Sequence, residues 1–115
     1  MSRIDKINEE VRREVANIIR ELKDSRIPIM TSVVAVNVTN DLRYAKIYVS
    51  VMGDEITKQK AIEGLKNASG YVRRELGKRL DLRYTPEPMF VLDNSIEHGA
   101  YINELLKGGS RGKID

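Results

Sequence analysis

The sequence predicts one two-layer α+β domain, in which three helices cover one face of a three-stranded sheet, in the order α-β-β-α-α-β plus a short C-terminal helix. Apolar residues recur at helical spacing at 4–22 and again at 62–80, which indicates amphipathic helices. Two β-branched stretches between them alternate apolar and polar residues, as strands do. With 115 residues and no cysteine, the chain can bury a core without disulfide bonds.

The first helix is predicted from its start signal and its apolar spacing. Ser2 and Asp5 can form a capping box, in which each side chain accepts a hydrogen bond from the other residue's backbone N–H. The helix is expected to end near residues 23–24, because the residue before Pro28 avoids helical geometry. Its apolar positions are spaced by three or four, and are Ile4, Ile7, Val11, Val15, Ile18, Ile19 and Leu22.

The next two elements are predicted to form an antiparallel hairpin. Residues 32–39 alternate and are expected to place Val34, Val36 and Val38 on one face. Asn40-Asp41 supplies turn residues. The second strand is expected at residues 44–51, where every other side chain is apolar and faces the core.

Two helices with a short break between them are predicted after the hairpin. The first is expected from about residue 56 to 67, with Gly64 as a weak point. The second is expected from Gly70 to about Leu80, after the joint Ala68-Ser69-Gly70. Ser69 can cap this helix, or allow close packing together with Gly70, or the joint can receive an RNA backbone; these alternatives stay open.

The third strand and the C-terminal end complete the prediction. Residues 89–92 are expected to form a short strand parallel to the second, with Pro86 and Pro88 at its entrance. Pro88 is expected to shorten this strand. A final helix is expected to begin near Asn94, so that residues 1–108 form one domain and residues 109–115 a flexible tail.

Positive charge is concentrated in the second half of the chain. From Lys66 to Arg83 there are six basic and two acidic side chains, whereas the whole chain has a net charge of only +3. A helix N-terminus with flanking basic residues can bind a phosphate backbone. The expected RNA-contacting residues in this stretch are Lys66, Ser69, Gly70, Arg73, Arg74, Lys78, Arg79 and Arg83.

Four further basic residues extend this expected surface. Arg3 and Lys6 begin the first helix, and Arg43 and Lys46 belong to the second strand. Each can instead be merely solvated. Tyr44 and Tyr48 share the exposed face of that strand and can stack on bases. A cross-strand aromatic contact is the favoured interpretation for these tyrosines.

The sequence offers little for catalysis. His98 is the single histidine and has no nucleophile motif nearby, although a small hydrolase using Asp93, Glu97 and His98 remains an alternative. Without cysteine, and with one histidine, thiolate and multi-histidine metal sites are excluded, and no cofactor is expected. No apolar signal or membrane-spanning stretch is found, which favours a cytoplasmic protein.

Several motifs, in this order along the chain, resemble the ribosome-binding factor A family. That family has a type II KH-like fold with an Ala-x-Gly joint instead of the Gly-x-x-Gly loop of RNA-binding KH domains, and Ala68-Ser69-Gly70 fits this joint. The resemblance covers nearly the whole chain. The matching motifs are KDSR at 23–26, AKIYVSV at 45–51, ASGYVR at 68–73, TPE at 85–87, FVLDNSIEHG at 90–99 and INELL at 102–106.

The resemblance implies a non-enzymatic factor in ribosome biogenesis. Such a factor binds the small ribosomal subunit and its ribosomal RNA late in maturation. It is tied to rRNA processing at the 5′ end and to growth in the cold (cold shock), and an assembly GTPase helps to release it. We expect a monomer, because no exposed apolar stripe is left over. The alternative from another class is a domain whose basic face binds an acidic protein.

Overall fold

The computed structural model describes residues 2–28 and 31–93. The three strands form one sheet in the order β1-β2-β3, with β1 antiparallel and β3 parallel to β2. The predicted two-layer α+β architecture and its element order are therefore confirmed over this part of the chain, while the expected final helix and tail lie outside it. The elements are α1 (Arg3–Glu21), β1 (Ser32–Val38), β2 (Tyr44–Ser50), α2 (Glu55–Asn67), α3 (Ser69–Arg79) and β3 (Glu87–Leu92).

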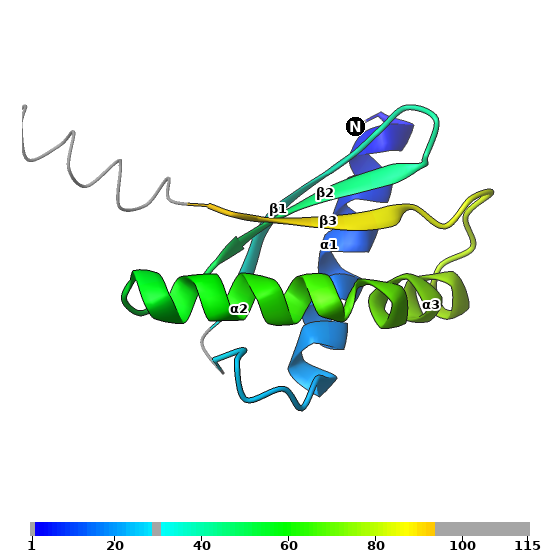
Figure 1. Cartoon of the computed structure of the whole chain (residues 1–115). Coiled ribbons are helices and arrows are strands. Elements are labelled where there is room, and N and C mark those ends of the chain that lie inside the picture. The colour runs from blue at the N-terminus through cyan, green and yellow to red at the C-terminus, as the bar shows by residue number, and fades with distance from the viewer. Residues whose placement is uncertain (1, 29–30, 94–115) are drawn as a thin grey trace, which may run out of the picture.

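The three helices pack on the same face of the sheet (Figure 1). Helix α1 contacts β1 and α3, while α2 and α3 both contact β3. One core cluster joins the inward side chains of α1, such as Val11 and Ile18, to Ile47 of β2 and Phe90 of β3. Within residues 2–28 and 31–93 no helix covers the opposite face of the sheet, where Met89 is 48% exposed.

The predicted capping box at the start of α1 is present. The Ser2 hydroxyl accepts a hydrogen bond from the Asp5 N–H at 3.2 Å, and the Asp5 carboxylate accepts one from the Ser2 N–H at 3.3 Å. The helix ends at Glu21, slightly earlier than predicted. The connection that follows lies against α2 at Gly64, where an added Cβ would be only 3.1 Å from Cγ1 of Ile27. Gly64, predicted as a weak point of the helix, makes room for this connection.

Strand β1 differs from the prediction at its start. Val33 pairs with Val49 and Ala35 pairs with Tyr48, so Val34 is an extra residue in a β-bulge. The bulge turns Val34 away from the core, where it is 39% exposed, and Val33 packs against the core instead. The predicted shared face of Val34, Val36 and Val38 is therefore wrong for Val34, because strict alternation does not continue through a bulge.

Strand β3 is longer than predicted, and Pro88 lies within it. The Glu87 N–H donates to the Arg43 carbonyl at 2.8 Å, and the Asp93 N–H donates to the Val49 carbonyl at 2.8 Å. Every second residue from Glu87 thus points its N–H toward β2, so the nitrogen of Pro88 faces the free edge, where no donor is needed. The expectation that Pro88 shortens this strand is wrong for that reason.

The joint between α2 and α3 is a single residue, Ala68. Its N–H bonds to the carbonyls of Gly64 and Leu65, both at 3.1 Å, and its own carbonyl accepts the Val72 N–H at 2.9 Å. Helical hydrogen bonding therefore continues almost to the break, where Ala68 leaves helical geometry with φ −87° and ψ 0°. Helix α3 begins at Ser69, one residue earlier than predicted.

Candidate nucleic-acid interface

Three segments that are distant in the sequence meet at one end of the molecule. They are the start of α1, the turn between β1 and β2, and the connection between α3 and β3. Together they enclose a hollow of about 480 Å³. We call it the hairpin-end hollow; it is lined by Arg3, Ile4, Ile7, residues 40–43, Arg83 and Tyr84. The structure thus brings together three of the predicted RNA-contacting residues, namely Arg3, Arg43 and Arg83.

The turn between β1 and β2 has a defined geometry. The Asp41 carboxylate accepts the Thr39 hydroxyl at 2.7 Å and the Arg43 backbone N–H at 3.1 Å. The bond from the hydroxyl, and then that from the backbone N–H, hold the pKa of Asp41 below its usual value, although slight desolvation opposes them. Leu42 between them has φ 62°, an unusual conformation for a leucine, and its N–H donates to the Thr39 carbonyl at 2.8 Å. Leu42 is thereby buried under the hollow at 8% exposure.

The positive charge around the hollow is only weakly balanced. The guanidinium of Arg43 lies 3.8 Å from the Asp41 carboxylate, and both side chains are mostly exposed. Arg83 lies over the ring of Tyr84 at 5.6 Å. Within residues 2–28 and 31–93, no carboxylate is in ion-pair distance of Arg3 or Arg83. These arginines can therefore accept an anionic partner without first breaking a strong pair.

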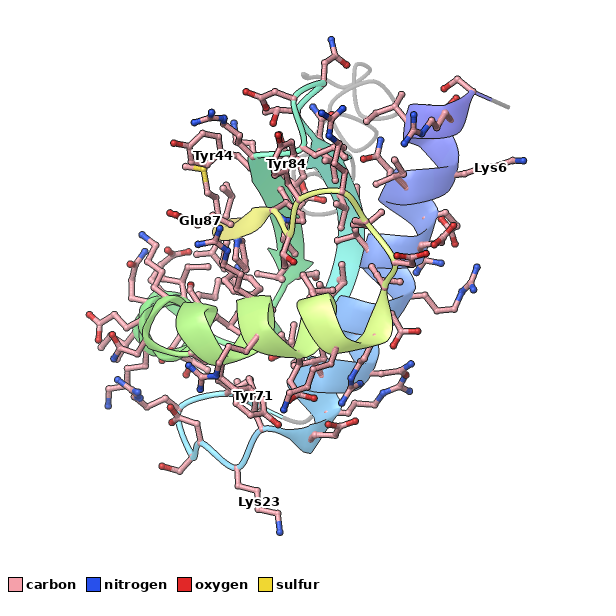
Figure 2. The ribbon with its side chains drawn as sticks, turned by 90° about the vertical axis from the view of Figure 1, so that its right-hand side faces the viewer. Lys6, Lys23, Tyr44, Tyr71, Tyr84 and Glu87 are labelled. Atoms are coloured by element: carbon pink, nitrogen blue, oxygen red, sulfur yellow. The ribbon has the colours of Figure 1, made fainter. Side chains whose placement is uncertain are left out.

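A second, smaller hollow of about 280 Å³ adjoins the first and shares Arg43 and Tyr84 with it. Arg73 of α3 lines it, and its Nε donates to the Thr85 carbonyl at 3.3 Å. Figure 2 shows Tyr44, Tyr84 and Glu87 on the same side of α3, with Tyr71 on the other side. Arg73 thus continues the basic surface from the hairpin-end hollow toward the middle of α3.

The joint between α2 and α3 carries the next group of predicted residues. Lys66, Gly70 and Arg74 are exposed. An added Cβ at Gly70 would meet no atom within 4 Å, so packing inside the chain does not require a glycine there. One interpretation predicted that Ser69 caps α3, and this is wrong. Ala68 is the N-cap residue, and the Ser69 hydroxyl donates to the Leu65 carbonyl at 3.4 Å.

Arg79 has a different environment from the other predicted arginines. Its guanidinium lies 2.7 Å from Glu21, 3.1 Å from Glu75 and 3.8 Å from Glu14. We call these four residues the α1–α3 clamp, because they join the two helices. The hydrogen bond to Glu21, and then that to Glu75, raises the pKa of Arg79, although desolvation opposes the rise. Lys78 lies next to the clamp, with its Nζ 3.4 Å from Glu75.

Lys6 and Lys46 do not join the hairpin-end hollow. Lys6 is exposed on α1 in a surface of mixed charge, which it shares with Arg13 and with Glu9, Glu10 and Glu14. Lys46 is on the open face of the sheet, with its Nζ 5.7 Å from the centre of the Tyr48 ring. The favoured cross-strand aromatic contact is not found among the described strands, because Tyr48 pairs with Ala35 and Val91, and Tyr44 pairs with Glu87.

Sequence reasoning missed the apolar floor of the hollow and its aromatic residue. Ile4 and Ile7 were predicted only as core positions, and Tyr84 was not considered. The signal for Tyr84 was its position directly after Arg83, a basic and aromatic pair in a connecting segment. No local signal points to the floor, because Ile7 and Leu42 meet only in the folded chain.

The described part of the chain contains no group of three acidic or histidine side chains that could hold a metal ion. None of its helices has the length and apolar character needed to cross a bilayer. Asp93 is the last described residue, so the alternative catalytic group with Glu97 and His98 lies outside the described residues.

Comparison with known proteins identifies the family. The family model for ribosome-binding factor A matches residues 3–106. The chain belongs to the ribosome-binding factor A family. Ribosome-binding factor A of Acetivibrio thermocellus is 59% identical over 107 residues, which cover 92% of this chain and 87% of that protein. The recognition made from the sequence motifs is therefore confirmed.

Solved structures of the ribosome-binding factor A family share the fold. The crystal structure of the protein from Thermus thermophilus superposes with a TM-score of 0.71 at 24% identity, covering 77% of this chain and 93% of that one. A homology model of the Thermus thermophilus protein was fitted into a cryo-electron-microscopy map of a 30S complex. It superposes with a TM-score of 0.64 at 24% identity, covering 76% of this chain and 91% of that one. The predicted KH-like fold is confirmed by these likenesses.

Proposed function

We propose that this protein is a non-catalytic assembly factor that binds the small ribosomal subunit through its ribosomal RNA. Family membership supports this, as does the Thermus thermophilus relative that was fitted into a 30S complex. The observation that carries the proposal is the convergence of Arg3, Arg43 and Arg83 on one hollow, with little carboxylate to balance them. Basic side chains gathered on one surface are the electrostatic footprint of a nucleic-acid binder.

The mechanism that we propose is recognition by charge and shape. Arginines at the hollow contact phosphates and fix the orientation of the protein on the RNA. The α2–α3 joint, with Lys66, Gly70 and Arg74 exposed, extends the same contact. Binding to one conformation of an immature subunit raises the population of that conformation, and this needs no bond to be made or broken.

The finer functions follow from the family resemblance and are part of the proposal. They are a role in late maturation with rRNA processing at the 5′ end, support of growth in the cold, and release with the help of an assembly GTPase. We also propose that the protein acts in the cytoplasm as a monomer.

The test is co-sedimentation of the purified protein with small subunits, large subunits and naked ribosomal RNA across a salt series. We expect selective association with small subunits that weakens as salt rises, because counterions compete for the phosphates. Nuclease treatment of the captured complex should release the protein. Equal binding to all three particles would reduce the protein to a general RNA binder. Nuclease-resistant capture would favour an acidic protein partner.

A further inference from the structure

The floor of the hairpin-end hollow is apolar, which a surface that contacts only phosphates does not need. Ile7 is 7% exposed and Leu42 is 8% exposed, and both line the hollow together with the partly buried Ile4. The hollow lies at the meeting point of three segments rather than in a surface ridge. Its volume of about 480 Å³ is within the range of small-ligand pockets.

The rim of the hollow supplies the complementary chemistry. Tyr84 is 55% exposed at one side, and its ring carries the Arg83 guanidinium at 5.6 Å. Aromatic rings and guanidinium planes are the groups on which proteins stack unpaired RNA bases. Asn40 adds an amide, which can both donate to and accept from a base edge. Arg3 and Arg43 lie around the same opening, where a backbone phosphate would be.

We propose that the hairpin-end hollow binds a single unpaired nucleotide of RNA, with its base over the floor of Ile4, Ile7 and Leu42 and against Tyr84, and its phosphates at Arg3 and Arg43. This inference rests on the proposed RNA-binding function and makes it more specific. In this arrangement the protein contacts an unstacked base of the folded RNA in addition to the sugar-phosphate backbone. The protein recognises such a base by stacking, so discrimination among the four bases is expected to be modest.

The first experiment follows the methyl groups of Ile4, Ile7 and Leu42 by NMR during titration of the whole protein. The probes are a ribonucleotide hexamer of adenosine, a matched hexamer in which every base is absent, and hexaglutamate. We expect ring-current shifts at these methyl groups with the base-bearing strand only. Ile56 is 67% exposed at the start of α2, and its methyl group is the internal control that should not shift.

Other outcomes of this titration overturn the proposal. Equal shifts with both hexamers would mean that the hollow contacts only the sugar-phosphate backbone. Absence of shifts with both would mean that it does not take an unpaired base. Shifts with hexaglutamate but not with RNA would favour an acidic peptide. If small-subunit association is retained in parallel assays, the proposed function survives each of the first two outcomes.

The second experiment compares two matched tyrosine variants, Tyr84→Leu and Tyr71→Leu. Both tyrosines are exposed, and they lie on opposite sides of α3 (Figure 2), so both proteins are expected to fold. Tyr84→Leu should weaken small-subunit association roughly tenfold, the typical loss of one base stack, without changing its salt dependence. Tyr71 is next to Gly70 at the α2–α3 joint, so the readout that compares the two variants is the set of base-dependent methyl shifts of Ile4, Ile7 and Leu42. Tyr84→Leu should reduce these shifts and Tyr71→Leu should not. Equal effects of the two substitutions on the shifts, or none from either, would refute the base-binding role of the hollow.

Discussion

The hairpin-end hollow and the α1–α3 clamp show two uses of the same side chain. Arg79 in the clamp is surrounded by Glu14, Glu21 and Glu75 at 2.7–3.8 Å and is about three-quarters covered. Arg43 at the hollow is 75% exposed, with a single carboxylate at 3.8 Å. An arginine in the first setting holds two helices together, whereas one in the second setting keeps its charge available to a partner.

This difference shows why charge counted along the sequence is a poor guide to a binding surface. Arg79 belongs to the basic stretch that the sequence analysis singled out, yet its partner Glu21 is 58 residues away. Arg3 and Arg43 lie far outside that stretch, yet they join Arg83 in space. We therefore expect substitutions at the hollow to weaken binding to the small subunit, and substitutions at the clamp to lower the stability of the fold.

The largest expected effect is on binding at the hollow. The triple variant Arg3→Gln, Arg43→Gln and Arg83→Gln should weaken small-subunit association roughly a hundredfold or more, because three phosphate contacts are lost. The slope of log affinity against log salt should fall by about three. Co-sedimentation across a salt series measures both quantities, and the thermal midpoint should remain close to that of the unaltered protein.

The matched control removes the same charge elsewhere. Arg20→Gln, Lys23→Gln and Lys60→Gln alter three exposed basic residues away from the hollow, and Lys23 lies at the far end of the molecule from Tyr84 (Figure 2). This variant should keep most of its affinity. If both triple variants lose binding equally, net charge alone drives association and the hollow is not the contact surface.

The next effect is on stability at the clamp. Arg79→Gln should lower the thermal midpoint by about two to five degrees, since Glu14 and Glu21 then lose their cation and Glu75 keeps only Lys78. Association with small subunits should stay within about twofold of the original, because little free charge is removed. A large loss of binding with an unchanged midpoint would assign Arg79 to the RNA surface instead.

The clamp should also make part of the stability dependent on pH. Burial raises the pKa of Glu75, but hydrogen bonds from Lys78 and Arg79 outweigh it, so the pKa lies below its usual value. A carboxylate of this kind stabilises the fold above its unfolded pKa, and the contribution is lost as pH falls through its folded pKa. The difference in midpoint between Arg79→Gln and the original should therefore begin to shrink as the pH falls below the usual glutamate pKa of about 4.3. Thermal unfolding from pH 7 to 3 measures it, and a constant difference would contradict the assignment.

The smallest effect is expected at the α2–α3 joint. Gly70→Ala should stabilise α3 by about 0.5–1 kcal/mol, because alanine favours helix and nothing lies near the new methyl group. If an RNA backbone approaches the joint closely, the same methyl group should weaken subunit association several-fold. Unchanged association would leave the hollow, rather than the joint, as the main contact.

Most of the fold was predictable because it depends on local patterns. Capping residues and apolar periodicity predicted every helix and strand of the described part, within a few residues at their ends. Two features of the strands were missed. The bulge at Val34 depends on pairing with β2, and the tolerance of Pro88 depends on which side of β3 faces the free edge.

The candidate site was less predictable than the fold. Residue types identified the arginines, but their grouping depends on contacts between distant segments. Nothing in the sequence near Arg79 reveals Glu14 and Glu21, and nothing near Arg83 reveals Ile4 or Leu42. The positive φ of Leu42 is likewise a result of the turn as a whole, because leucine by itself disfavours that conformation.

Pro88 and the bulge at Val34 have a shared consequence for self-association. In the order β1-β2-β3, these two residues lie in the two outer strands of the sheet. Free strand edges can add strands from other molecules, which leads to aggregation or domain swapping. A proline removes one donor from the row on β3, and a bulge distorts the row on β1, so neither edge is a regular template. The irregular edges are therefore expected to lower the tendency of the sheet to add a strand from a second copy of the chain.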